Sequence, residues 1–145
     1  MAITPLVAQH VEEVVHGNWT EIHFDDAIAD VTYTEAVTLP PGIINSIAML
    51  VNHLQFYNNI VIQRLAGENP VIDNANGFAV GKLTENDWQQ LKSNALNSFK
   101  KLADAVRQLT DENILMQPAG WHNTVYKTLH GVSEHAHYHL GQIVL

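Results

Sequence analysis

Apolar side chains recur every three or four positions between residues 88 and 109, and this spacing constrains the fold more than any other feature of the sequence. The stripe consists of Trp88, Leu91, Ala95, Phe99, Leu102, Val106 and Leu109. Because an α-helix has about 3.6 residues per turn, these side chains line one face of a helix. Thr84-Glu-Asn-Asp87 precedes the stripe and resembles a capping box with Asp in place of the usual Glu, so we expect the helix to begin there. We interpret the stripe as core.

Three other segments have the same periodicity. Their apolar stripes are Leu6, Val7, Val11, Val14 and Val15 in the first, Ile47, Leu50, Leu54, Val61 and Leu65 in the second, and Val125, Val132, Ala136 and Ile143 in the last. The expected N-terminal caps are Thr4, Asn45 or Ser46, and Asn123 or Thr124, and the expected stops are Gly17 and Gly67. We expect a short helix or turns over residues 25–35 and connections over 68–83 and 110–123. This pattern predicts an all-α protein, a four-helix bundle with long connections in which residues 1–145 form one domain.

Composition excludes several classes of function. The chain has no Cys, which excludes disulfides, Cys-based zinc sites and a thiol nucleophile, and fits a reducing cytoplasm. Seven Lys and Arg against fifteen Asp and Glu give a net charge of −8, which argues against a nucleic-acid partner. There is no signal-peptide pattern and no apolar run of the roughly 18 residues that a membrane helix needs. We therefore expect a cytoplasmic protein without a membrane partner.

Two histidines of the last helix have the spacing of metal ligands. His135 and His139 lie one turn apart on the apolar face, whereas His130, Glu134 and His137 fall on the opposite side. Imidazoles at positions i and i+4 can converge on one transition-metal ion at roughly 2.0 to 2.1 Å. Two ligands are too few, and in a chain without Cys the third must be another His or a carboxylate.

The second predicted helix offers the third ligand. One side of this helix is polar and carries Asn52, Gln55, Asn59 and Gln63. His53 falls with the apolar set, where it is either a core histidine hydrogen-bonded to a neighbour or a ligand that completes an open three-nitrogen site with His135 and His139. Tyr57, one turn after His53, and Gln142, three residues after His139, are candidates to touch a ligand or a substrate.

Carboxylates elsewhere offer an alternative. Asp25, Asp26 and His23 could reach a metal, although we expect them at the surface. If one of these residues or Glu134 completed the coordination shell, a structural site would be favoured, because structural zinc sites usually have four protein ligands.

The histidine motifs also resemble those of a known family. Asn45-Ser-Ile-Ala-Met-Leu-Val-Asn-His53-Leu and His135-Ala-His-Tyr-His139-Leu-Gly-Gln-Ile143, with His16-Gly17-Asn-Trp19, are similar to segments of the DinB-like superfamily of bacterial metalloproteins. The resemblance implies an up-up-down-down bundle in which His53, His135 and His139 bind a divalent metal. Homodimers are common among these relatives, which include S-transferases that use bacillithiol, mycothiol or glutathione and a thiol-dependent maleylpyruvate isomerase.

The sequence narrows the function without fixing a reaction. Three neutral imidazoles leave a divalent ion its full charge and an open position, where a water or thiol loses its proton near neutral pH. We expect a metal-dependent enzyme with a small-molecule substrate, such as a low-molecular-weight-thiol-dependent S-transferase. The alternatives are a metal-dependent hydrolase and a non-catalytic metal-binding or stress-related module. Zn or Ni is favoured, with Fe, Mn, Co and Cu as further candidates. No catalytic residue is assigned, and no organic cofactor is expected.

Overall fold

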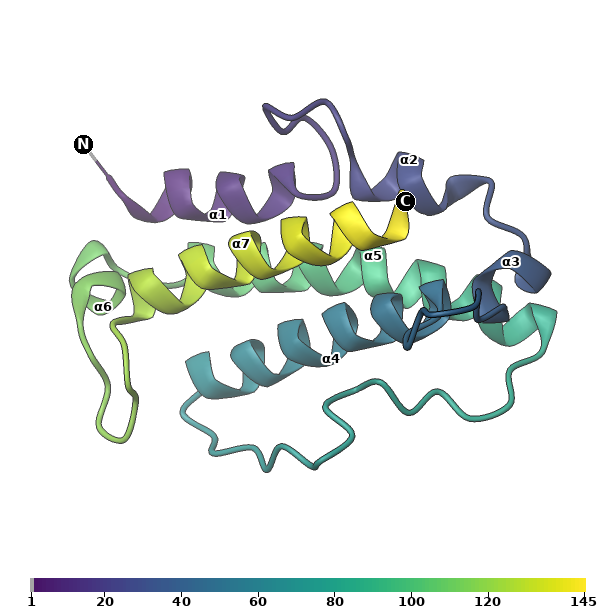
Figure 1. The fold of residues 1–145 in the computed structure, drawn as a ribbon. Coiled ribbons are helices and arrows are strands. Elements are labelled where there is room, and N and C mark those ends of the chain that lie inside the picture. The colour runs from purple at the N-terminus through teal and green to yellow at the C-terminus, as the bar shows by residue number, and fades with distance from the viewer. Residues whose placement is uncertain (1) are drawn as a thin grey trace.

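The computed structural model describes residues 2–145, and over these residues the protein is all-helical and contains no strand (Figure 1). The helices are α1 (Thr4–Glu13), α2 (Phe24–Ala29), α3 (Tyr33–Val37), α4 (Ile47–Leu65), α5 (Glu85–Arg107), α6 (Asp111–Leu115) and α7 (Val125–Ile143). The predicted all-α class is therefore confirmed. None of these helices is both long and apolar enough to cross a membrane.

Four helices, α1, α4, α5 and α7, pack lengthwise around the core. Helix α5 packs against α1 and α4, and α7 packs against the same two helices from another side. The predicted stripe on α5 is buried from Trp88 to Val106, and Leu109 packs against the core. Full burial of a large apolar side chain stabilises a fold by about 1.5–3 kcal/mol, so this stripe is a major source of stability.

The direction of the four helices differs from the prediction. Figure 1 shows α1 and α7 running one way and α4 and α5 the other, so the order along the chain is up, down, down, up. Contacts between helices agree. Arg107 at the end of α5 reaches Glu12 of α1, whereas Lys92, nearer the start of α5, reaches the carbonyl of Ala29, which is later in the chain, so the two segments run in opposite directions. The predicted up-up-down-down order is wrong. The chain instead turns back across one end of the bundle through α2 and α3, and only the connection over residues 66–84 runs along the bundle.

Local signals placed most helix boundaries correctly. The side chains of Ser46, Thr84 and Thr124 each accept a hydrogen bond from the first turn of their helix, and Thr84 and Asp87 form the predicted capping box. Such a cap stabilises a helix by about 1 kcal/mol. Thr4 is an exception. It lies inside α1, and its backbone N–H and hydroxyl both donate to the Asp111 carboxylate of α6, a helix that the sequence did not predict.

The connection between α4 and α5 lies against α4 at one point. The Asn52 side chain donates to the carbonyl of Gly77 at 2.7 Å. Gly77 has a φ of +77°, and a Cβ atom there would lie 2.6 Å from the Cβ of Phe56. Both the backbone conformation and the close approach require glycine. This contact fixes the neighbouring residues Asn76 and Phe78 beside the middle of α4.

Candidate metal centre

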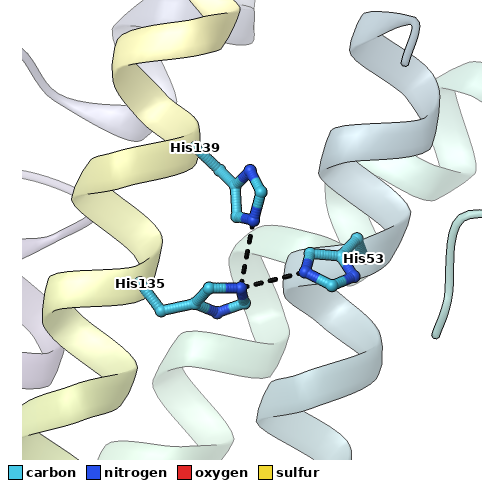
Figure 2. A group of neighbouring side chains, drawn as sticks. All are labelled: His53, His135 and His139. Carbon is cyan, nitrogen blue, oxygen red and sulfur yellow. Dashed lines mark hydrogen bonds between the residues drawn. The ribbon is translucent and has the colours of Figure 1, made fainter. Parts of the chain in front are cut away.

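Three histidine side chains from two antiparallel helices point toward one another inside the bundle (Figure 2). His53 comes from α4, and His135 and His139 come from α7. The Nε2 atom of His135 lies 2.9 Å from Nε2 of His53 and 3.0 Å from Nε2 of His139. His53 and His139 are only 5% and 7% exposed, and His135 is half-buried. The structure thus brings together the three histidines that the sequence singled out, which we call the buried triad.

Hydrogen bonds on the far side of two rings determine which nitrogen carries the proton. The Nδ1 atom of His53 lies 2.5 Å from the carbonyl oxygen of Asn76, and Nδ1 of His139 lies 2.6 Å from Oε1 of Gln142. Because an oxygen of either kind accepts, each Nδ1 must donate. A neutral imidazole has one N–H, so the Nε2 atoms of His53 and His139 are left with free lone pairs directed at the centre of the group.

Burial favours the neutral form of His53 and of His135. Desolvation lowers the pKa of His53, and the neighbouring His139 adds to the effect, while the hydrogen bond to the Asn76 carbonyl opposes it. Desolvation also lowers the pKa of His135, to about 4, with further contributions from His139 and His53. Neutral imidazole is the form that binds a metal ion, so both residues are in the ligating form at neutral pH.

The three nitrogens fit one ion. Nitrogens bound at about 2.0–2.1 Å to a tetrahedral ion are about 3.3 Å apart, so the observed separations need to open only slightly. Without an ion, at most one N–H, that of His135, points at the lone pairs of the other two Nε2 atoms. These buried nitrogens can accept more hydrogen bonds than the three rings donate. The donor set is therefore that of a metal centre with three nitrogen ligands.

No carboxylate completes the shell among residues 2–145, since the only ligand atoms clustered with one another at this point are those of the three histidines. Glu134 lies on the exposed side of α7, where it pairs with Lys127 and His130. His23 and Asp26 form a separate group with His16 near the start of α2. Three protein ligands leave a position open, the arrangement typical of reactive rather than structural sites.

Aromatic rings and a strained residue hold the centre in place. Phe78 stacks on His53 with ring centroids 3.9 Å apart, and Tyr57 presents its ring edge-on to His53 and His135. The Tyr57 hydroxyl donates to Oδ1 of Asn76 at 2.7 Å. Asn76 has a φ of +54°, a left-handed conformation that Asn tolerates better than most residues. This conformation presents its carbonyl to His53.

Sequence reasoning placed Tyr57 and Gln142 beside the histidines, and the structure shows the contacts of each. It missed Asn76 and Phe78. The sequence predicts residues 68–83 only as an irregular connection between two helices. The Asn74–Gly77 stretch, rich in Asn and Gly, is a signal for a turn with a left-handed residue, but not for which helix the turn contacts.

A large cavity adjoins the triad on the side of His135. Its volume is about 920 Å³, and it lies between the second half of α4, the first half of α7 and residues 118–123. Tyr57 and His135 line it at the end nearest the triad, and Arg64, Trp121 and Lys127 line it further away. Small-molecule sites commonly have volumes of about 300–1,000 Å³, so the cavity is large enough for a substrate.

The protein is a helical bundle in which three histidines converge beside a cavity. These features place it in the class of candidate helical metalloproteins. A family model described as the DinB superfamily matches residues 15–143, and the chain belongs to this superfamily. No curated protein and no solved structure matches the chain. Membership was predicted from the histidine motifs and is confirmed.

Proposed function

We propose that the protein is a metal-dependent enzyme in which His53, His135 and His139 hold one divalent transition-metal ion, and that it transfers a low-molecular-weight thiol to an electrophilic substrate. The observation that carries the proposal is the convergence of three Nε2 atoms, two of them with lone pairs fixed by hydrogen bonds at Nδ1, without a carboxylate ligand. The adjoining cavity supplies room for the reactants.

A divalent ion held by neutral ligands supplies Lewis acidity, which lowers the pKa of a thiol or water that binds to it. The chain's own residues prepare the site. The Asn76 carbonyl and the Gln142 side chain keep the lone pairs of His53 and His139 directed inward. Phe78 covers one face of His53 and excludes water from it. Tyr57 lies between the triad and the cavity, because its ring packs against that of His135 and the residue also lines the cavity where a substrate would lie.

The first test is metal content by elemental mass spectrometry on protein purified without an affinity tag. We expect near-stoichiometric Zn or Ni in the wild type and a loss of most of it in His53→Ala and in His135→Ala. His137→Ala is the matched control, because His137 is on the same helix but bonds to the carbonyl of Ser133 rather than to the triad. A wild-type protein that holds no metal, even after reconstitution with Zn or Ni, would overturn the proposal.

The second test concerns the reaction. Metal-loaded wild type should accelerate the consumption of a thiol by 1-chloro-2,4-dinitrobenzene, and His135→Ala should not. Ester hydrolysis without thiol transfer, by protein that holds stoichiometric metal, would replace the transferase proposal with a hydrolase. Metal binding with neither activity would favour a non-catalytic metal-binding module.

A further inference from the structure

The chain has two arginines, and only one of them has an ionic partner. Arg107, at the end of α5, pairs with Glu12 and Asp104. Arg64, in the last turn of α4, is half-buried, lines the cavity and makes no ion pair with any residue in the range 2–145. A guanidinium presents several hydrogen-bond donors in a planar fork that matches a carboxylate or a phosphate. Arg64 is therefore a free anion-binding group inside the cavity.

The lining of the cavity is not acidic, although the protein as a whole is. The charged residues that line the cavity are Arg64, Lys127 and Glu68, so the lining has two cations and one anion, in contrast to the net charge of −8. Lys127 reaches Glu134 at 3.4 Å, but both side chains are more than half exposed, so this pair is weak. The lining therefore lacks the excess of negative charge that the whole chain has, and Arg64 is its one Lys or Arg without an ionic partner among residues 2–145.

The distance between Arg64 and the triad sets the size of a ligand that contacts both. Arg64 is eleven positions after His53 on the same helix, which is about 16 Å along the helix axis. Helical side chains lean toward the N-terminus, so the Arg64 side chain covers part of this distance. The remaining gap of about 10 Å is close to the length of three extended residues.

We propose that Arg64 binds a carboxylate of an elongated, peptide-sized ligand whose other end lies at the buried triad. The inference rests on the proposed function, and it specifies the substrate class of that site as a carboxylate-bearing small molecule. Arg64 also lies at the C-terminal end of α4, where a cation interacts favourably with the helix dipole. That role affects stability alone, so ligand binding distinguishes the two.

The test uses a probe without a free thiol, so that it does not depend on the metal. Metal-free ¹⁵N-labelled protein is titrated at millimolar concentrations with S-methylglutathione and, separately, with its diethyl ester, which has no carboxylates. We expect the acid to shift the indole signal of Trp121 and the amide signal of Gly131, which line the cavity, and to leave the core residue Trp88 unchanged. The ester should bind about tenfold more weakly.

Variants assign the effect to Arg64. Arg64→Gln should weaken binding of the acid about tenfold and leave binding of the ester unchanged, while Arg64→Lys should retain part of the preference. Lys101→Gln removes the same charge from an exposed position on α5 and should change neither ligand. Equal binding of acid and ester to wild type, no binding of either, or full acid binding by a folded Arg64→Gln would overturn the inference. A wild type that binds the acid through Arg64 but takes up no metal would instead count against the proposed function alone.

Discussion

Two groups of side chains in this protein have the chemistry of metal ligands, and they differ in how they are supported. The buried triad and a surface group of His16, His23 and Asp26 each bring three possible ligand atoms within 4.8 Å of one another. The triad comes from the middle of two long helices. The surface group comes from the turn after α1 and the start of the short helix α2, where His16 and Asp26 are exposed. Proximity alone does not separate the two groups.

Hydrogen bonding at Nδ1 separates them. In the triad, Asn76 and Gln142 accept from Nδ1 and leave the Nε2 lone pairs free. In the surface group, Nδ1 of His23 accepts from the backbone N–H of Gly17 at 3.3 Å, so the proton of a neutral His23 is on Nε2. His16 is turned toward Asp25, at 3.1 Å. A donated bond from Nδ1 of His16 to Asp25 leaves Nε2 of His16 free, as in the triad, so the two groups differ at His23, where a metal must compete with the existing bond from Gly17.

The largest expected difference between the two groups is in stabilisation by metal. Adding Zn to metal-free wild type at about a thousand times the dissociation constant should stabilise it by about 4 kcal/mol, measured as a rise in melting temperature. His53→Ala should lose this rise and His23→Ala should keep it. If His23→Ala lost the rise and His53→Ala kept it, the comparison would be reversed.

A substitution at Gln142 sharpens the comparison by removing only the support of a ligand. Gln142→Leu leaves Nδ1 of His139 without its acceptor, and loss of such a partner typically weakens metal binding about 10–100-fold. A competition titration with a chromophoric chelator would measure the change. Gln63→Leu, at an exposed position of α4, is the control and should bind as wild type does. Unchanged affinity in Gln142→Leu would show that the hydrogen bond does not matter.

A substitution at Gly77 should move the connection between α4 and α5, and with it the Asn76 carbonyl that accepts from His53. Gly77→Ala places a Cβ atom against Phe56 in a strained backbone conformation, so we expect a loss of about 1–3 kcal/mol in the free energy of unfolding and weaker metal binding. Gly81→Ala is matched, since Gly81 lies in the same connection, also has a positive φ of +62° and has nothing within 4 Å of an added Cβ. Denaturant titration of both variants checks the difference. Equal effects would mean that the contact with Phe56 is unimportant.

The smallest expected effect is a pH dependence of the metal-free protein. In the folded protein, the pKa values of His53 and His135 lie below the ordinary histidine value of about 6.5. The pKa of His135 is lowered to about 4, so the unfolded chain binds more protons than the folded protein between about pH 6.5 and pH 4. Stability is therefore full above about pH 6.5 and falls as the pH decreases toward 4. Because His135 is only half-buried, we expect its contribution to be about 1 kcal/mol. Denaturation curves of wild type and His135→Ala at several pH values test this. An identical dependence of the free energy of unfolding on pH in the two proteins would contradict it.

Features with a local physical cause were predictable from the sequence. The stripe on α5, the caps Ser46, Thr84 and Thr124, and the facing of His53, His135 and His139 into the bundle all follow from helical periodicity and from the first residues of each helix. Burial of the stripe can be predicted without knowing which helix packs against it, because an amphipathic helix buries its apolar face.

Features that depend on distant contacts were not predictable. Asp111 bonds to Thr4 across 107 residues, and no local signal connects them. Asn76 reaches His53 through an irregular connection whose path is set by its packing on α4. The direction of the helices likewise depends on which end of the bundle each connection crosses. The sequence did not single out Arg64, because a cation in the last turn of a helix is common, and only the cavity distinguishes it.

The most direct measurement of the central claim is X-ray absorption spectroscopy of the zinc-loaded protein. We expect three imidazole nitrogens at about 2.0–2.1 Å and one further light ligand. We also expect the spectrum of His23→Ala to match that of wild type. A shell with fewer than three imidazoles, or one that changes when His23 rather than His53 is replaced, would contradict the claim that the buried triad is the metal site.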